Sequence, residues 1–285
     1  MNMRTEVSGA STRQIPDLWF LEQFDQWVES DPDRFALAVD HPDVTEEYTY
    51  RDVFDYSVKV ARALTSMGVK PGDRIGILMD NSPKWVFTIL GIIRLGAVGV
   101  PLSTLLPADS VRRLVKHAEC RQVFTDSSNV ETGLEALAGL DELGVELVAD
   151  APATVGATSW NQFLASGEGQ EWAPAKSPDG TAVLVYTSGT TGDPKGVMIS
   201  TRGLSHDIDG IIELIDLDPN QRILSVLPFS HVLPLVANGL GALAAGCGVV
   251  FLLTITPQSI IGAFKNHHIT FFVCVPQFFY AVHKR

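Results

Sequence analysis

Short runs of apolar, mostly β-branched residues alternate along this chain with longer stretches in which apolar side chains recur every three or four positions. The first pattern is typical of buried strands and the second of amphipathic helices. In the first half they predict strands at 74–79, 98–102, 122–125 and 145–148, and helices at 50–67, 83–95, 108–119 and 131–140. Strands that alternate with helices of about 10–15 residues indicate β-α-β units. We therefore expect an α/β fold of mostly parallel sheets with helices on both faces.

The segment Ala165–Gly180 interrupts this alternation. It is rich in Gly, Pro, Ser and charged residues and has neither periodicity, so it predicts a linker between two α/β subdomains, 16–164 and 181–285, after a loose leader at 1–15. Beyond the linker the alternation resumes, with strands predicted at 182–186, 197–200, 223–226, 249–253 and 269–275 and helices at 204–215, 235–245, 260–266 and 277–285.

One uncharged stretch resembles a membrane span. No formal charge lies between Arg222 and Lys265, and Val232–Ile255 is long enough to cross a bilayer. Pro234, Asn238 and several glycines interrupt it, and its second half becomes β-branched. The pattern therefore favours a buried helix, a turn and a buried strand over a membrane span.

Composition narrows the class of protein. The chain has 285 residues, 46% hydrophobic and 19% charged, which is typical of a globular protein. Its net charge is −12, with an acidic excess in the first 60 residues that indicates a solvated surface, and it lacks the clustered Lys and Arg of a nucleic-acid partner. The N-terminus has no apolar signal region, and the three cysteines Cys120, Cys247 and Cys274 lie apart in apolar surroundings. These features predict a cytoplasmic protein with reduced thiols, and they leave peripheral membrane association open.

A loop rich in Gly, Thr and Ser carries the candidate chemistry. Thr187–Gly196 joins two predicted strands and reads TSGTTGDPKG. Glycines let backbone N–H groups approach an anion, hydroxyls add donors, and Lys195 adds a positive charge, so the loop suits a polyphosphate. It is not a Walker A loop, because Gly196 and a strand follow the lysine where that motif needs Ser or Thr and a helix. A flexible turn without function is the alternative.

The stretch YTSGTTGDPKGVMIS, Tyr186–Ser200, resembles the phosphate-binding signature of the adenylate-forming superfamily, which includes acyl-CoA synthetases, firefly luciferase and nonribosomal peptide adenylation domains. Tyr48–Val53, Leu95–Leu102 and Leu227–His231 resemble further motifs of that superfamily in the same order, so the resemblance spans about residues 16–285. Asn81–Trp85 and Ser225–His231 are most similar to the long-chain fatty acyl-CoA synthetases.

The resemblance implies a fold of stacked, mostly parallel sheets and a two-step reaction. A carboxylate, here a fatty acid, attacks the α-phosphate of ATP to give an acyl-adenylate and pyrophosphate, and coenzyme A then takes the acyl group as a thioester. Lys195 is the implied catalytic residue, Thr190 the implied Mg²⁺ ligand, and His231 the implied border of the acyl pocket, although a structural histidine at an apolar helix start is the alternative for His231. The residues implied to hold the β- and γ-phosphates are Thr187, Ser188, Gly189, Thr190, Thr191, Gly192 and Lys195.

The sequence also departs from the superfamily pattern. Thr201 stands where the superfamily usually has a histidine, and the adenine-binding, ribose-binding and C-terminal segments do not appear before Arg285. We therefore expect an incomplete N-terminal domain that needs a C-terminal domain and is inactive alone. Two alternatives stay open: a fatty acyl-AMP ligase that loads a carrier protein, and a non-catalytic nucleotide-binding remnant. The pair His267-His268 is expected to be a solvated helix end rather than a metal site.

Overall fold

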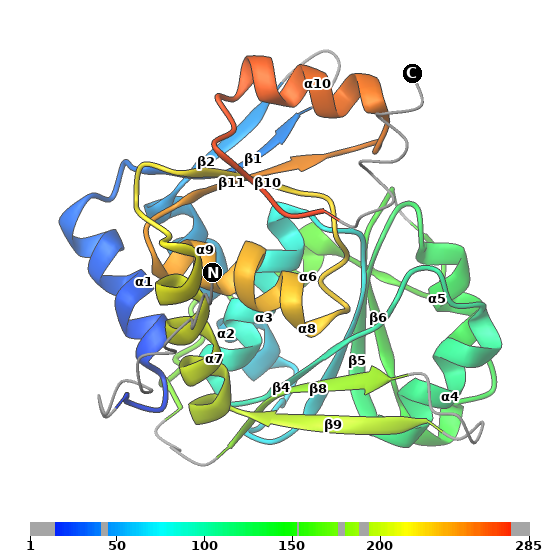
Figure 1. Ribbon diagram of the computed structural model, residues 1–285. Coiled ribbons are helices and arrows are strands. Elements are labelled where there is room, and N and C mark those ends of the chain that lie inside the picture. The colour runs from blue at the N-terminus through cyan, green and yellow to red at the C-terminus, as the bar shows by residue number, and fades with distance from the viewer. Residues whose placement is uncertain (1–14, 41–44, 153, 176–179, 188–193, 275–285) are drawn as a thin grey trace, which may run out of the picture.

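Two stacked β-sheets with helices between them and outside them make up the computed structural model (Figure 1). It describes residues 15–40, 45–152, 154–175, 180–187 and 194–274. One sheet has five strands in the order β12-β10-β11-β1-β2, and the other has seven in the order β7-β6-β5-β3-β4-β8-β9. All neighbouring strands are parallel except the pairs β1–β2 and β8–β9. The expected class of stacked, mostly parallel α/β sheets is confirmed.

The strands of the five-stranded sheet are β1 (Phe35–Asp40), β2 (Glu46–Thr49), β10 (Arg222–Ser225), β11 (Gly248–Leu252) and β12 (Phe271–Phe272). Those of the seven-stranded sheet are β3 (Arg74–Leu78), β4 (Val98–Pro101), β5 (Cys120–Asp126), β6 (Glu146–Asp150), β7 (Thr158–Ser159), β8 (Thr181–Thr187) and β9 (Lys195–Ser200). The helices are α1 (Trp19–Ser30), α2 (Tyr50–Ser66), α3 (Pro83–Leu95), α4 (Ala108–Ala118), α5 (Val130–Leu137), α6 (Trp160–Ser166), α7 (Thr201–Ile215), α8 (Val232–Pro234), α9 (Gly241–Ala244) and α10 (Pro257–Asn266), with a 3₁₀ turn at Asp141–Leu143 and a π-helical segment at Leu235–Leu240.

Alternation along the strands divides the core into layers. In the five-stranded sheet Leu37 faces the central layer while its neighbour Ala38 faces α10, because successive side chains point to opposite faces. In the seven-stranded sheet Ile77 faces the same central layer while Leu78 faces α4. Helices therefore cover both faces of both sheets, with α10 outside one sheet and α4 and α5 outside the other (Figure 1).

The helix α3 lies in the central layer and is apolar nearly all round. It begins at Pro83, where the Ser82 side chain accepts a hydrogen bond from the Trp85 N–H, and it ends at the left-handed Gly96, as the sequence predicts. Every residue of α3 except Lys84 is buried. Close packing on α2 depends on Gly91, where a Cβ would come within 2.5 Å of the Val60 side chain. Helix α3 thus has no solvent face to carry a polar stripe.

The first 50 residues are more than an acidic surface. Helix α1 buries Phe20, Phe24 and Val28 in the central layer, while acidic residues such as Glu22 and Glu29 stay exposed. Helix α1 and strands β1 and β2 are not among the predicted elements, because the acidic side chains of this segment mask its apolar stripe.

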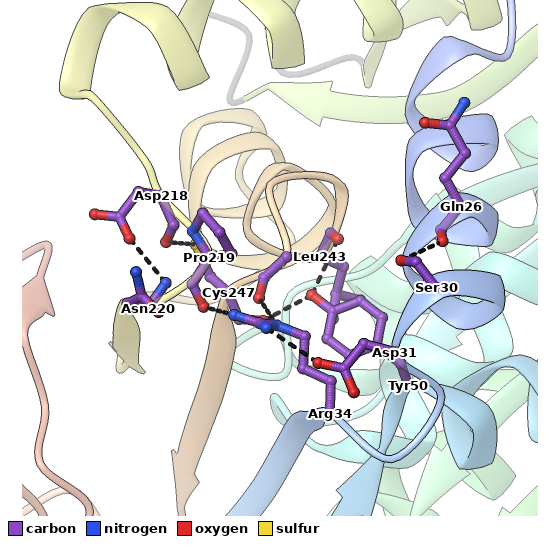
Figure 2. A network of polar contacts seen from close by, with 11 residues as sticks. Gln26, Ser30, Asp31, Arg34, Tyr50, Asp218, Pro219, Asn220, Leu243 and Cys247 are labelled. Atoms are coloured by element: carbon purple, nitrogen blue, oxygen red, sulfur yellow. Dashed lines mark hydrogen bonds and ion pairs between the residues drawn. The ribbon is translucent and has the colours of Figure 1, made fainter.

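The predicted linker does not separate the two sheets. Strands β8 and β9 follow it and join the sheet of β3–β7, whereas β1 and β2 precede it and join β10–β12. Figure 2 shows one junction of early and late segments, where Arg34 donates hydrogen bonds to the carbonyls of Pro219 and Gly246. The buried Tyr50 hydroxyl meets the Leu243 and Cys247 carbonyl oxygens at 3.1 and 2.9 Å. Each sheet is therefore built from both sides of the linker.

The uncharged stretch forms a helix and a strand, as expected. Its helix runs from α8 through the π-helical segment to α9, and its strand is β11. Among the residues that the structure describes, no helix has both the length and the apolar character to cross a membrane. The predicted final strand is shorter than expected, since only Phe271 and Phe272 pair with β10. The predicted helix at 277–285 lies outside the described residues, as does the expected leader, apart from Ile15.

Because the thiols of Cys120 and Cys247 are buried, we expect the protein to lose stability in alkaline solution. Burial raises the pKa of both Cys120 and Cys247 to about 12, and the nearby Asp218 adds to the shift of Cys247. Because the unfolded thiols release their protons near pH 8.5 while the folded ones keep them, the free energy of unfolding falls as the pH rises above about 8.5. The slope reaches up to about 1.4 kcal/mol per pH unit for each thiol. Urea unfolding between about pH 8 and 10 measures it.

The double variant Cys120→Ala, Cys247→Ala serves as the control for this prediction. Without the two thiols, the free energy of unfolding should change much less over the same pH range. An equally steep fall in the double variant would assign the alkaline loss to other groups.

Candidate functional site

The predicted phosphate loop is the connection of a β-hairpin. Strands β8 and β9 pair antiparallel, with Thr187 opposite Lys195 and Tyr186 opposite Gly196. Thr187 and Lys195 are both exposed, at the ends of the strands where the connecting loop begins and ends. As expected, the loop joins two strands, and the next helix, α7, begins only at Thr201. The other predicted phosphate ligands, Ser188, Gly189, Thr190, Thr191 and Gly192, lie outside the described residues, and with them the predicted Mg²⁺ ligand.

Near the loop, strand β8 of this hairpin is bound to helix α4. The Tyr186 hydroxyl lies 2.7 Å from Nδ1 of His117, in the last turn of α4, and the two rings meet edge to face. Burial raises the pKa of Tyr186 to about 12, so the phenol stays neutral near pH 7 and keeps its hydrogen bond. At Gly196 a Cβ would come within 2.8 Å of the Leu184 side chain, so glycine allows the hairpin to close tightly. No local pattern singles out His117, because its partner is 69 residues away.

The hairpin lies at the edge of the sheet where the parallel strands end. Because β8 is parallel to β4, and β4 to β3, the carboxyl ends of the three strands share one edge. Ligands of open α/β sheets bind outside this edge. Thr187 and Lys195 therefore present a hydroxyl and an ammonium group where a polyphosphate could be held, and this donor set fits that ligand.

A cavity of about 320 Å³ opens at the carboxyl ends of strands from both sheets. Residues after β3 and β4 form one side, and residues at the ends of β10 and β11 form the other. Eight of its fourteen lining residues are apolar and six are polar. The lining residues are Met79, Asp80, Asn81, Leu102, Thr104, Ser225, Val226, Pro228, Phe229, Ser230, Leu252, Leu253, Thr254 and Ile255.

A short polar network organises the β3 side of this cavity. The Asp80 N–H donates a 2.7 Å hydrogen bond to Oδ2 of Asp126 at the end of β5, and the Thr104 hydroxyl donates a 2.9 Å bond to Oδ1 of Asp80. Burial raises the pKa of Asp126, and the hydrogen bond from Asp80 opposes that shift. The turns that follow β3, β4 and β5 are thereby tied together.

The predicted acyl-pocket residue His231 lies next to the cavity wall. It is exposed and immediately precedes α8, and the residue before it, Ser230, lines the cavity. Contact between His231 and a substrate remains a prediction. The Ser230 hydroxyl is buried and has no hydrogen-bond partner among the described residues, so the wall contains at least one polar atom without a protein partner. Pattern analysis did not single out Ser230 as a site residue.

The histidine pair differs from its expectation. His267 is buried rather than solvated, and its Nε2 lies 3.4 Å from Oδ1 of Asp40, whereas His268 is exposed. The prediction of a solvated helix end is therefore wrong for His267, because the chain after α10 turns inward under the end of β1. Within the described ranges, no group of three or more His, Cys, Asp or Glu side chains could hold a metal ion.

Comparisons with known proteins agree with this architecture. The sequence profile of a family described as AMP-binding enzyme matches residues 24–284. The ATP-bound structure of MatB from Rhodopseudomonas palustris superposes with a TM-score of 0.77 at 23% identity, covering 94% of this chain and 51% of that one. At that identity the likeness shows the fold.

Two curated proteins are similar in sequence. Long chain acyl-CoA synthetase 4 of Arabidopsis thaliana is 32% identical over 201 residues, which are 65% of this chain and 30% of that protein. The 4-coumarate–CoA ligase 3 of Oryza sativa subsp. japonica is 32% identical over 235 residues, which are 81% of this chain and 42% of that protein. The matches thus span less than half the length of either relative.

Proposed function

We propose a function for this chain from the premise that it belongs to the AMP-binding enzyme family. It supplies the phosphate loop and part of the acid-binding cavity of an ATP-dependent, AMP-forming ligase that converts a fatty acid to its coenzyme A thioester. The observation that carries the proposal is the placement of the hairpin with Thr187 and Lys195 at the carboxyl edge of the seven-stranded sheet, the edge that also borders the cavity.

In the proposed first step a carboxylate oxygen of the acid attacks the α-phosphorus of ATP. The bond from that phosphorus to the bridging oxygen breaks, and pyrophosphate leaves with the electron pair. Lys195 and Thr187 hold the β- and γ-phosphates and stabilise the negative charge that grows on them. Thr190 would hold Mg²⁺, which would supply further neutralisation of the phosphate charge. In the second step the coenzyme A sulfur attacks the acyl carbonyl carbon and AMP leaves.

The fatty-acid part of the proposal has two supports. The cavity has an apolar part, formed by residues such as Leu102, Phe229 and Leu252, which could contact an alkyl chain. One relative is named a long chain acyl-CoA synthetase. The other relative is named a 4-coumarate–CoA ligase, so an aromatic acid is the second candidate substrate. Cytoplasmic location, with or without peripheral membrane contact, is part of the proposal.

The test uses the chain extended to the length of its relatives. Exchange of radiolabelled pyrophosphate into ATP is measured with butyrate, decanoate, palmitate or 4-coumarate as the acid. We expect exchange to depend on decanoate or palmitate, and added coenzyme A to yield the thioester. Exchange with 4-coumarate alone would overturn the fatty-acid preference. Exchange without thioester formation would favour a carrier-loading acyl-AMP ligase, and no exchange with any acid would favour a non-catalytic remnant.

The 285-residue chain alone is expected to form no acyl-CoA, because the resemblance assigns adenine and ribose binding to segments that it does not include. Thioester formation is followed by mass spectrometry with ATP, Mg²⁺, palmitate and coenzyme A present. Product at a rate like that of the extended protein would contradict this expectation.

A further inference from the structure

We infer that Asn81 is a positioning residue for the acid-binding cavity: its side-chain amide fixes the segment Val226–His231 against the end of β3. This inference deepens the proposed function and rests on it for the identity of the ligand. The hydrogen bonds of Asn81 to this segment are contacts between residues that the structure describes.

Asn81 pairs with the segment through both halves of its amide. Its Nδ2 donates a 2.7 Å hydrogen bond to the Leu227 carbonyl oxygen and a longer one, 3.3 Å, to the Ser225 hydroxyl. Its Oδ1 accepts a 2.9 Å hydrogen bond from the Phe229 N–H. An amide that donates to one residue and accepts from the next but one imitates the peptide group of a neighbouring strand.

The segment follows β10 after that strand has ended. Among the residues that the structure describes, the backbone groups of Leu227 and Phe229 have no ladder partner in the five-stranded sheet. Phe229 is buried, and its N–H would lose its partner if the Asn81 amide were removed. The Phe229 ring packs on Trp85 of α3, which holds the side chain but not the backbone.

The position of the tie relates it to the cavity. Asn81 and four residues of the segment, namely Val226, Pro228, Phe229 and Ser230, line the same space. Asn81 follows β3, the central strand of the seven-stranded sheet, and the segment follows β10 of the five-stranded sheet. The hydrogen bonds therefore set the distance between two walls that belong to different sheets. Asn81 acts through the segment, so it positions the binding wall and takes no part in the reaction itself.

The first arm of the test uses hydrogen–deuterium exchange on the 285-residue chain. In Asn81→Ala we expect the Phe229 amide to exchange at least about tenfold faster, while amides of β5 keep their rates. In Asn81→Asp one carboxylate oxygen can still accept from the Phe229 N–H, so that amide should stay protected although the bond to the Leu227 carbonyl is lost. Gln162→Ala is the control, because its amide also accepts a backbone N–H, that of Ser159, but at the start of α6.

The second arm measures kinetics on the extended protein. Asn81→Ala and Asn81→Asp should raise KM for the acid about tenfold and leave KM for ATP unchanged, while Gln162→Ala changes neither. A general loss of folding would alter both KM values or the fraction of active enzyme. An unchanged Phe229 amide in Asn81→Ala, or an equal rise of both KM values, would overturn the inference. The parent protein and its variants could all lack ATP–pyrophosphate exchange while the Phe229 amide still exchanges deuterium faster in Asn81→Ala. In that case the proposed function fails, and the positioning of the segment by Asn81 is upheld.

Discussion

Replacing Lys195 by alanine is expected to lower acid-dependent ATP–pyrophosphate exchange in the extended protein by about 100- to 1,000-fold, the loss typical of removing one preorganised donor from a developing negative charge. Lys195 begins β9 opposite Thr187, at the mouth of the hairpin. Its side chain is exposed, so its ammonium group can reach a bound phosphate without first breaking core packing. Exchange kinetics with saturating acid measure the effect.

Two further variants make this prediction specific. Lys195→Arg keeps the charge with a different shape and should retain part of the activity. Lys70→Ala removes another exposed lysine, just before β3 at the opposite edge of the sheet, and should leave exchange unchanged. The melting temperature of Lys195→Ala should equal that of the parent. Exchange within about threefold of the parent would remove Lys195 from the phosphate site.

Replacing Phe229 by alanine is expected to lower the free energy of unfolding by about 3–5 kcal/mol, the usual loss when a buried Phe is truncated and the space stays partly empty. The ring is 1% exposed and lies in the central layer, with centroids 4.9 Å from Trp85 and 6.0 Å from Phe251. A Cβ at Gly239 would come within 3.3 Å of the ring, so the π-helical segment closes over it. Urea unfolding of the 285-residue chain measures the loss.

Phe264→Ala is the matched control for Phe229→Ala. Phe264 lies on α10 outside the five-stranded sheet, and 41% of it is exposed. Its truncation should cost about 1 kcal/mol, since less surface is buried there and water can fill the space. Equal losses in the free energy of unfolding would show that Phe229 contributes no more to stability than the partly exposed Phe264.

Local signals in the sequence were enough to predict single elements. Helix α3 occupies the predicted range because Ser82 and Pro83 are a start signal and Gly96 is a stop signal, all within a few residues of the helix ends. The two strands that flank the phosphate loop are predicted on the same grounds, since two apolar runs flank a Gly-rich loop, but their antiparallel pairing is not. The choice of sheet for each strand depends on partners far along the chain. Strand β8 joins β4 across the composition break at 165–180, a pairing that composition does not report.

The candidate site divides in the same way. The phosphate loop stays a prediction from consecutive residues, and the structure places Thr187 and Lys195 on the two strands that flank it. Asn81 and His117 act on residues 148 and 69 positions away, and no local pattern reports such contacts. The prediction for His267 is wrong for a similar reason, since the residue it meets, Asp40, lies 227 positions earlier in the chain.

Strand β1 lies between β2 and β11 in the five-stranded sheet, and its Val39 pairs with Phe251. On the ribosome, the first strand must therefore wait for more than 200 further residues before its parallel partner exists. At about 5–20 residues per second, this delay lasts on the order of 10–40 s. During that time the apolar residues of α1 and β1 have only the partial central layer to cover them. The emerging N-terminal segment therefore exposes apolar surface to which chaperones can bind during synthesis.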